Sequence, residues 1–233
     1  MRVETIGDAT LYLGDCMEIL PTLNRDGGVL VSDPPYGIDY ACGMGGKFKD
    51  VHIAGDGDLA VRDYVLDLFK FQPALVFGTW KRPRPVATRQ VIVWEKGDHV
   101  GMGDLSLPWR PNTEEIYVLG TGFSGHRGSS VIKINAPSPN FTPEAERFHP
   151  TEKPVALMCE LIAKCPPGPI FDPFMGGGAT GVAAMRLGRS FVGIEINSTY
   201  FATCCRRIEQ AYKQRPLFDA EPVKPPEQLG LVA

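Results

Sequence analysis

The chain has 233 residues, 43% hydrophobic and 22% charged, which is ordinary for a globular protein and enough for one well-buried domain. A net charge of −3 excludes a wholly basic DNA-coating protein but not a local basic cleft. Residues 1–10 lack the apolar core of a signal peptide and no apolar run approaches membrane-spanning length, so we expect a cytoplasmic protein without membrane contact. The six cysteines form no C-x-x-C pair and the four histidines are scattered, so we expect no metal site.

Apolar runs separated by turns predict the elements of the first half of the chain. They are a strand over Thr10–Leu13, a helical turn over Met17–Leu20, a strand over Val29–Ser32, a helix over Leu59–Phe71 and strands over Ala74–Phe77, Gln90–Trp94 and Glu115–Leu119. Residues 37–58 hold six glycines together with Lys47 and Lys49. We expect this stretch to form a mobile loop beside a functional site.

The second half begins with an irregular stretch and then returns to alternating elements. Residues 120–148 have little apolar periodicity and are expected to form a loop. The sequence then predicts helices over Pro154–Lys164, Gly181–Leu187 and Ser198–Tyr212, and strands over Pro169–Phe171 and Phe191–Ile194. Residues 214–233 carry four prolines and are expected to be a disordered tail. This alternation predicts a single α/β domain over residues 1–213, with a mostly parallel twisted sheet covered by helices on both faces.

A carboxylate and an aromatic ring follow the predicted strand at Val29–Ser32. Pro34 and Pro35 lack the N–H groups that a strand ladder needs, so the chain must leave the sheet at Asp33. Asp33, the Pro34 carbonyl and Tyr36 are then presented at the carboxyl end of a strand, where open α/β sheets bind ligands. The two acceptors can bind N–H groups and the Tyr36 ring can stack on a flat surface, so this arrangement suits a ligand with a flat, amine-bearing ring. The alternative is that the prolines only end a strand and Tyr36 fills the core.

A glycine turn follows the predicted strand at Pro169–Phe171. Gly176 and Gly178 let the backbone turn tightly into the next helix and let a ligand come close. Glu195 ends the next strand, 23 positions after Asp172, a spacing that suits a carboxylate binding a ribose. The two carboxylates together favour a nucleotide-like cofactor over a turn that is tight for structural reasons alone.

Three motifs in combination make the chain resemble the S-adenosylmethionine-dependent amino-methyltransferases that modify DNA. They are Asp33-Pro34-Pro35-Tyr36, Thr151-Glu152-Lys153-Pro154 and Asp172-Pro173-Phe174-Met175-Gly176-Gly177-Gly178-Ala179-Thr180. The Asp-Pro-Pro-Tyr motif lies upstream of the Phe-x-Gly-x-Gly motif, which resembles the circularly permuted beta-type order and is most like the adenine-N6 enzymes. Protein and small-molecule methyltransferases usually carry the glycine motif first, so the order counts against them. The resemblance implies a Rossmann-like methyltransferase fold. It also implies that a bacterium or phage encodes the protein.

The resemblance implies S-adenosylmethionine as the cofactor and assigns residues to it. Those implied around its methionine part are Asp172, Pro173, Phe174, Gly176, Gly178 and Thr180. Glu195 would bind the ribose hydroxyls, and Asp15, with the Cys16 backbone beside it, would bind the adenine. Lys153 would lie near the carboxylate of the cofactor.

The same resemblance implies the exocyclic amine of adenine in double-stranded DNA as the target. Asp33 and the Pro34 carbonyl would each accept one N–H of the amine, so that its lone pair points at the methyl group. Pro35 completes the motif, the base must be flipped out of the duplex, and Tyr36 would stack on it. Cytosine N4, an RNA or protein amine, and an inactive DNA-binding relic stay open as alternatives.

Weaker patterns concern how DNA is bound. Side chains that could contact phosphates, or form a solvated loop, are Lys81, Arg82, Arg84 and Arg89. Residues 120–148 would read the target sequence; they are short for this family, which implies a short target or help from a second subunit, so a homodimer stays open. Gln214–Phe218 resembles a bacterial sliding-clamp-binding peptide, with a docking or disordered segment as the alternative. We expect Met102 and Trp109 in the core rather than as wedges between bases.

Overall fold

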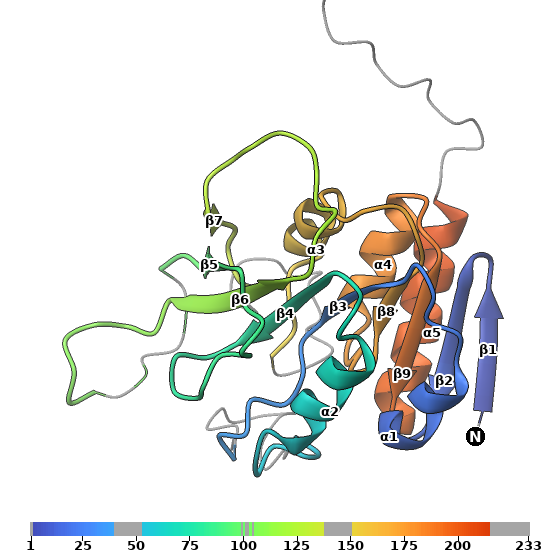
Figure 1. Cartoon of the computed structure of the whole chain (residues 1–233), viewed down its shortest axis with the longest axis horizontal. Coiled ribbons are helices and arrows are strands. Elements are labelled where there is room, and N and C mark those ends of the chain that lie inside the picture. Colours follow the sequence, from blue (N-terminus) through green and yellow to red (C-terminus); the bar gives the residue numbers. More distant parts are fainter. Residues whose placement is uncertain are drawn as a thin grey trace, which may run out of the picture.

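The computed structural model describes residues 2–39, 53–98, 100, 103, 105–137 and 151–214. Its strands are β1 (Arg2–Ile6), β2 (Ala9–Leu13), β3 (Val29–Ser32), β4 (Ala74–Gly78), β5 (Gln90–Glu95), β6 (Thr113–Leu119), β7 (Val131–Lys133), β8 (Ile170–Asp172) and β9 (Phe191–Glu195). They form one sheet in the order β1-β2-β9-β8-β3-β4-β6-β5-β7 (Figure 1). Pairing is parallel from β2 through to β4 and between β5 and β7. It is antiparallel where β1 meets β2 and where β6 meets β4 and β5.

Helices cover both faces of this sheet. They are α1 (Cys16–Ile19), the 3-10 helix η1 (Leu20–Thr22), α2 (Ala60–Leu68), α3 (Val155–Ile162), α4 (Ala179–Arg186) and α5 (Ser198–Lys213). The helices α1, η1 and α2 pack on one face, where Ile19, Leu20 and Val65 meet Leu30 and Phe171 of the strands. The other three helices pack on the opposite face (Figure 1). The predicted Rossmann-like α/β fold, mostly parallel and with permuted motif order, is confirmed. None of the helices described has the length and hydrophobicity needed to cross a membrane.

The strand order reverses between β3 and β8. From β8 the chain passes through α4 to β9 on one side, and from β3 it passes through α2 to β4 on the other. β3 and β8 are parallel neighbours, with Val29 opposite Ile170 and Leu30 opposite Phe171. Their carboxyl ends therefore open into the same crevice, which is where open α/β sheets bind ligands.

Helix α4 is buried along almost its whole length, and its small residues explain how. The buried run extends from Ala179 to Met185. A Cβ atom on Gly181 would lie 2.5 Å from Ile208 Cδ1 of α5 and 2.8 Å from Phe191 Cε1 of β9. Small side chains therefore let α5 and the sheet close on α4 from both sides, which holds the first turn of α4 at the crevice.

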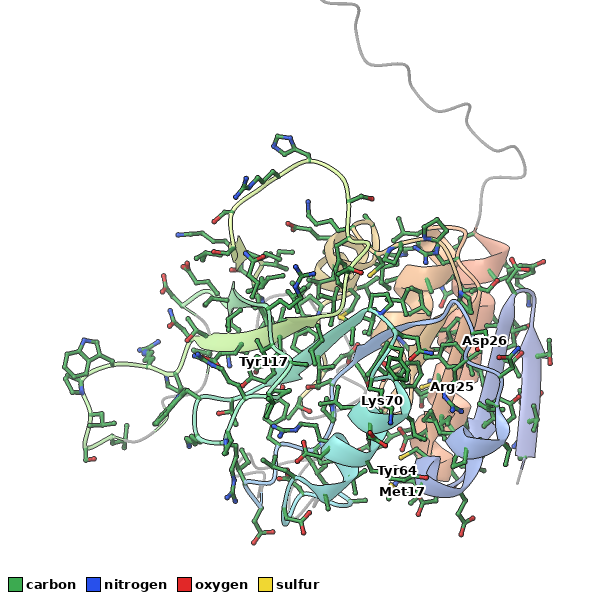
Figure 2. All side chains as sticks on the ribbon, in the orientation of Figure 1. Met17, Arg25, Asp26, Tyr64, Lys70 and Tyr117 are labelled. Carbon is green, nitrogen blue, oxygen red and sulfur yellow. The ribbon has the colours of Figure 1, made fainter. Side chains whose placement is uncertain are left out.

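The short α1 and η1 pack against α2 and secure the entry to β3. Figure 2 shows Met17 of α1 and Tyr64 of α2 at the same end of the molecule, where the two helices contact each other. The guanidinium group of Arg25 donates to the Leu23 carbonyl at 2.9 Å and lies 5.9 Å from the centre of the Phe69 ring. These contacts fix the chain just before β3, and hence the position at which Asp33 leaves the sheet.

The two outermost strands have no clear signal in the sequence. β1 has no buried residue, so it lacks the alternation that predicts a half-buried strand. β7 lies within residues 120–148, so the expectation of a loop throughout that stretch is wrong for Val131–Lys133. Only Ile132 of its three residues is buried, which is too short a pattern to detect. Residues 138–148, like 40–52 of the predicted mobile loop and 215–233 of the predicted tail, lie outside the described residues.

The connection between β5 and β6 projects beyond the ends of these two strands (Figure 1). Trp109 in this connection is 78% exposed, so the expectation that it lies in the core is wrong. Leu105 and Leu107 are exposed as well, and Met102 lies outside the described residues. A lone aromatic residue in a stretch without periodicity carries no sequence signal for its burial.

Replacing Leu157 with alanine should lower the free energy of unfolding by about 2–5 kcal/mol, because its fully buried side chain joins α3 to the core. Glu160→Ala is the matched control, since Glu160 is exposed in the same helix. It should change the free energy by less than about 0.5 kcal/mol. Urea unfolding followed by circular dichroism measures both, and equal effects would contradict the packing of α3.

Candidate active site

One cavity of about 650 Å³ lies at the carboxyl ends of β3, β8 and β9. The predicted site residues that line it are Asp15, Cys16, Asp33, Pro34, Pro35, Tyr36, Lys153, Asp172, Pro173, Phe174, Gly176, Thr180 and Glu195. Gly178, the remaining predicted residue, caps the amino end of α4 directly behind this lining. The volume is within the range of cofactor and small-molecule sites. The structure thus brings the motifs into one cavity.

Asp172 ends β8 and organises the glycine turn. Its Oδ1 accepts hydrogen bonds from Ser32 Oγ at 2.6 Å and from the Phe174 N–H at 3.2 Å. Its Oδ2 accepts one from Thr180 Oγ1 at 2.5 Å. Burial raises the pKa of Asp172 to about 6, against the lowering effect of these hydrogen bonds. Because Ser32 ends β3, this carboxylate also ties together the two strands at which the order reverses.

The glycine turn needs backbone conformations that favour glycine. Gly176 and Gly178 have φ angles of +48° and +81°. A Cβ atom on Gly178 would also lie 3.1 Å from Cys204 Sγ of α5. Cys204 donates its S–H to the Gly176 carbonyl at 2.9 Å, and burial raises the pKa of this thiol well above its ordinary value. The thiol therefore supports the turn from behind and is no nucleophile.

Glu195 faces the glycine turn from the end of β9. Its Oε2 accepts the N–H of Gly176 at 2.9 Å and its Oε1 accepts the N–H of Asn197 at 2.8 Å. A carboxylate oxygen has two acceptor positions, so each can still receive one more donor, which suits a pair of ribose hydroxyls. Burial raises the pKa of Glu195 to about 7.

Asp15 and Cys16 form the neighbouring wall of the cavity. Asp15 caps the amino end of α1, with its Oδ1 accepting the Met17 N–H at 2.8 Å. The Gly14 N–H donates to the Glu195 carbonyl at 3.0 Å, which holds this wall against the end of β9. Burial raises the pKa of the Cys16 thiol to about 12, so it stays protonated.

The segment Thr151–Pro154 joins the glycine turn to the Asp-Pro-Pro-Tyr motif. Glu152 Oε1 lies 2.7 Å from an Arg207 nitrogen, and Arg207 also donates to the Gly177 carbonyl. Lys153 Nζ donates to Asp33 Oδ2 at 2.6 Å. The role of Lys153 beside the carboxylate of the cofactor stays a prediction, because its ammonium group is engaged by Asp33.

Asp33 belongs to a cluster of two carboxylates, two ammonium groups and one phenol. Tyr36 Oη donates to Asp33 Oδ1 at 2.6 Å. The side chain of Lys153, only 6% exposed, places Nζ 2.6 Å from Asp33 Oδ2 and 3.3 Å from Glu114 Oε2. Lys96 Nζ lies 3.1 Å from Glu114 Oε1. With both carboxylates and both ammonium groups ionised, the cluster is electrically neutral, as a buried set of charges must nearly be.

The neighbouring charges set the pKa values within this cluster. Burial acts to raise the pKa of Glu114, but Lys153 and Lys96 outweigh it and hold that pKa below its ordinary value. Burial acts to lower the pKa of Lys153, but Asp33 and Glu114 outweigh it and raise that pKa. Burial raises the pKa of Asp33, with Lys153 opposing and Glu114 adding to the rise. Glu114 is thus the firmly ionised carboxylate of the cluster.

Three residues of the site lie outside the predicted motifs: Ser32, Lys96 and Glu114. Ser32 could have been found from its place next to Asp33 at the end of a buried strand. Lys96 and Glu114 stand at facing ends of β5 and β6, in a part of the chain without a recognisable motif. The only available signal was an acidic pair, Glu114 and Glu115, directly before an apolar run.

The basic stretch after β4 is largely occupied by internal contacts. Arg82 donates to the Gly37 carbonyl, and Arg89 donates to the Gly120 carbonyl at 2.8 Å. Arg84 binds both oxygens of Glu115, at 2.6 and 3.1 Å. Contact of these side chains or Lys81 with DNA phosphates stays a prediction, and Lys47 and Lys49 lie outside the described residues.

A family profile described as DNA methylase matches residues 78–205, which is more than half of the chain. The chain belongs to the DNA methylase family. It is therefore a methyltransferase of the N6/N4 group, which acts on exocyclic amines of DNA bases and takes the methyl group from S-adenosylmethionine.

Relatives of known sequence agree with this membership. This chain is 27% identical over 212 residues to the methylase YubD of Escherichia coli K12, and the match covers 84% of this chain and 88% of YubD. It is 49% identical over 65 residues to the DNA adenine methyltransferase YhdJ of Escherichia coli K12, covering 27% of this chain and 22% of YhdJ.

Solved structures share the fold of this methylase. The complex of M1.HpyAVI with SAM superposes with a TM-score of 0.60 at 21% identity, covering 85% of this chain and 99% of that one. The cytosine-N4-specific PvuII DNA methyltransferase gives a TM-score of 0.62 at 15% identity, covering 90% and 93%.

The residues of the cavity fit S-adenosylmethionine. Asp172 and Glu195 place carboxylates around a turn in which glycines leave the backbone open to a ligand. Glu195 keeps acceptor positions for two hydroxyl groups, and Asp15 adds a further carboxylate at the neighbouring wall. In the described part of the chain, no group of three or more His, Cys, Asp or Glu side chains is placed to hold a metal ion.

Binding of S-adenosylmethionine should weaken as the pH falls through about 7, because Glu195 then gains a proton and loses an acceptor position. The affinity at about pH 6 should be roughly tenfold lower than at about pH 8. Glu195→Gln should bind weakly at both pH values and lose most of this dependence. Isothermal titration calorimetry measures the dissociation constants, and an equal pH dependence in both proteins would contradict the role of Glu195.

Proposed function

We propose that this methylase transfers the methyl group of S-adenosylmethionine to N6 of an adenine flipped out of double-stranded DNA. The observation that carries the proposal is the position of the Asp33 carboxylate at the end of β3, in the same cavity as Asp172 and Glu195. An aspartate at the start of the Pro-Pro-Tyr motif and the similarity to the adenine methyltransferase YhdJ favour adenine.

The cofactor residues would act by binding and orienting. Glu195 would accept the ribose hydroxyls and Asp15 would accept from the adenine amine of the cofactor. The glycine turn after Asp172 would accommodate the methionine part. S-adenosylmethionine, when bound, supplies an electrophilic methyl group. No protein nucleophile is required, and the protonated thiols of Cys16 and Cys204 accord with this.

Asp33 would prepare the amine for attack. The lone pair of an exocyclic amine is delocalised into its ring, which makes the nitrogen a weak nucleophile. Asp33 and the Pro34 carbonyl would each accept one N–H, which draws the nitrogen toward a pyramidal geometry and directs the lone pair at the methyl group. The base must leave the duplex to reach them, and the Tyr36 ring would then hold it by stacking.

Cytosine N4 is the second candidate target. The structural similarity to the cytosine-N4-specific PvuII enzyme favours it, and both bases present an amine with two N–H groups to Asp33. Expression of the chain in bacteria that lack DNA methylation, followed by mass spectrometry of the nucleosides, distinguishes the two. We expect N6-methyladenine; N4-methylcytosine alone would refute the adenine assignment, and unmodified DNA would refute both.

The homodimer and the contact of Gln214–Phe218 with a sliding clamp stay predictions. Residues 215–218 lie outside the described part of the chain. Light scattering of the full chain and clamp binding before and after removal of residues 214–233 would test the two ideas separately.

Asp33→Ala should reduce methyl transfer by at least about a hundredfold, because the amine loses an acceptor on which its geometry depends. Its dissociation constant for S-adenosylmethionine should change little, since the substitution leaves Asp15, Asp172 and Glu195 in the cavity. Transfer of a radiolabelled methyl group to unmethylated genomic DNA measures the first quantity and calorimetry the second. Asp67→Ala, an exposed carboxylate of α2, is the control. Full transfer by Asp33→Ala would disprove this mechanism.

A further inference from the structure

Both oxygens of Asp33 already hold a hydrogen-bond donor. Tyr36 Oη donates to Oδ1 and Lys153 Nζ donates to Oδ2, each at 2.6 Å. Distances this short mark strong, charge-assisted bonds. An incoming amine would have to share Asp33 with these two donors, which would make the carboxylate a weaker acceptor for the N–H that the proposed chemistry requires.

Glu114 offers both donors a second acceptor. Its Oε2 lies 3.3 Å from Tyr36 Oη and 3.3 Å from Lys153 Nζ, the same two atoms that occupy Asp33. Its other oxygen, Oε1, is held by Lys96 Nζ at 3.1 Å, which fixes the direction of the carboxylate. A small movement of each donor therefore moves its hydrogen bond from Asp33 to Glu114.

We propose that Glu114 is a positioning residue of the methyl-transfer reaction: its Oε2 takes over the hydrogen bonds of Tyr36 and Lys153 when Asp33 accepts the amine of the target base. The inference rests on the proposed function. It assigns to the start of β6 a part in the reaction that no sequence motif indicates.

The charges of the cluster support such an exchange. A buried ammonium group without a partner is strongly destabilising, so Lys153 can leave Asp33 only if another carboxylate receives it. Glu114 is close enough and is ionised, and Lys96 balances its charge throughout. The exchange therefore leaves the total charge of the cluster unchanged and no buried donor unpaired, while Asp33 becomes a stronger acceptor for the base.

The test is Glu114→Gln in the full chain, because glutamine keeps the size of the side chain but offers Lys153 no negative charge. We expect methyl transfer to fall about tenfold to a hundredfold in kcat. The dissociation constant for S-adenosylmethionine should stay within about twofold, because only the transfer geometry changes. Transfer to unmethylated genomic DNA and calorimetry are the two measurements.

Glu95→Gln is the matched control. Glu95 ends the neighbouring strand β5, and its carboxylate lies 3.1 Å from Lys133 Nζ instead of in the Asp33 cluster. We expect its kcat to stay within about twofold of the wild-type value. Equal transfer by Glu114→Gln and the wild type would overturn the inference while leaving the proposed function intact. A wild-type chain that does not methylate DNA would overturn both.

A double-mutant cycle with Tyr36→Phe separates exchange of hydrogen bonds from a merely structural role. Without the phenol, one of the two donors on Asp33 is already gone, so Glu114→Gln should cost less in that background than in the wild type. Strictly additive effects would show that Glu114 does not act through Tyr36 and would overturn the inference.

Discussion

The active site depends on one buried cation, the ammonium group of Lys153. It belongs to a segment that precedes α3, yet it lies between a carboxylate that follows β3 and one at the start of β6. A charge with so little access to water is tolerated only when it is paired, so these three parts of the chain must meet for the fold to be stable. The interaction that stabilises the cavity therefore also positions Asp33.

Among the residues predicted to bind the cofactor, a second buried carboxylate is also paired, but its partners are uncharged. Asp172 is buried as well, and its partners are the hydroxyls of Ser32 and Thr180 and a backbone N–H, not a cation. Its pKa accordingly rises, whereas that of Glu114 falls. The site thus keeps one carboxylate that gains a proton easily and one that stays charged. Hydroxyl partners suit the end that would meet a cationic cofactor, because a protein cation there would repel it.

Motifs and apolar runs in the sequence predicted much of this fold and site. They did not predict which side chains contact each other in the folded protein. The central strands were predictable because their buried runs are continuous, whereas β1 and β7 bury too little to leave a pattern. The cavity was predictable because Asp33 and Asp172 both end buried strands, and such ends share one edge of a sheet. Glu114 was not, because its importance comes from lying 3.3 Å from two donors, a relation that spacing in the sequence does not encode.

The order of the motifs has a consequence for how the protein is made. All four residues of β3 are buried, and β8, which covers one side of β3, is synthesised well over a hundred residues later. A ribosome-bound chain therefore holds a bare apolar strand edge through most of its synthesis, a surface on which other chains can pair.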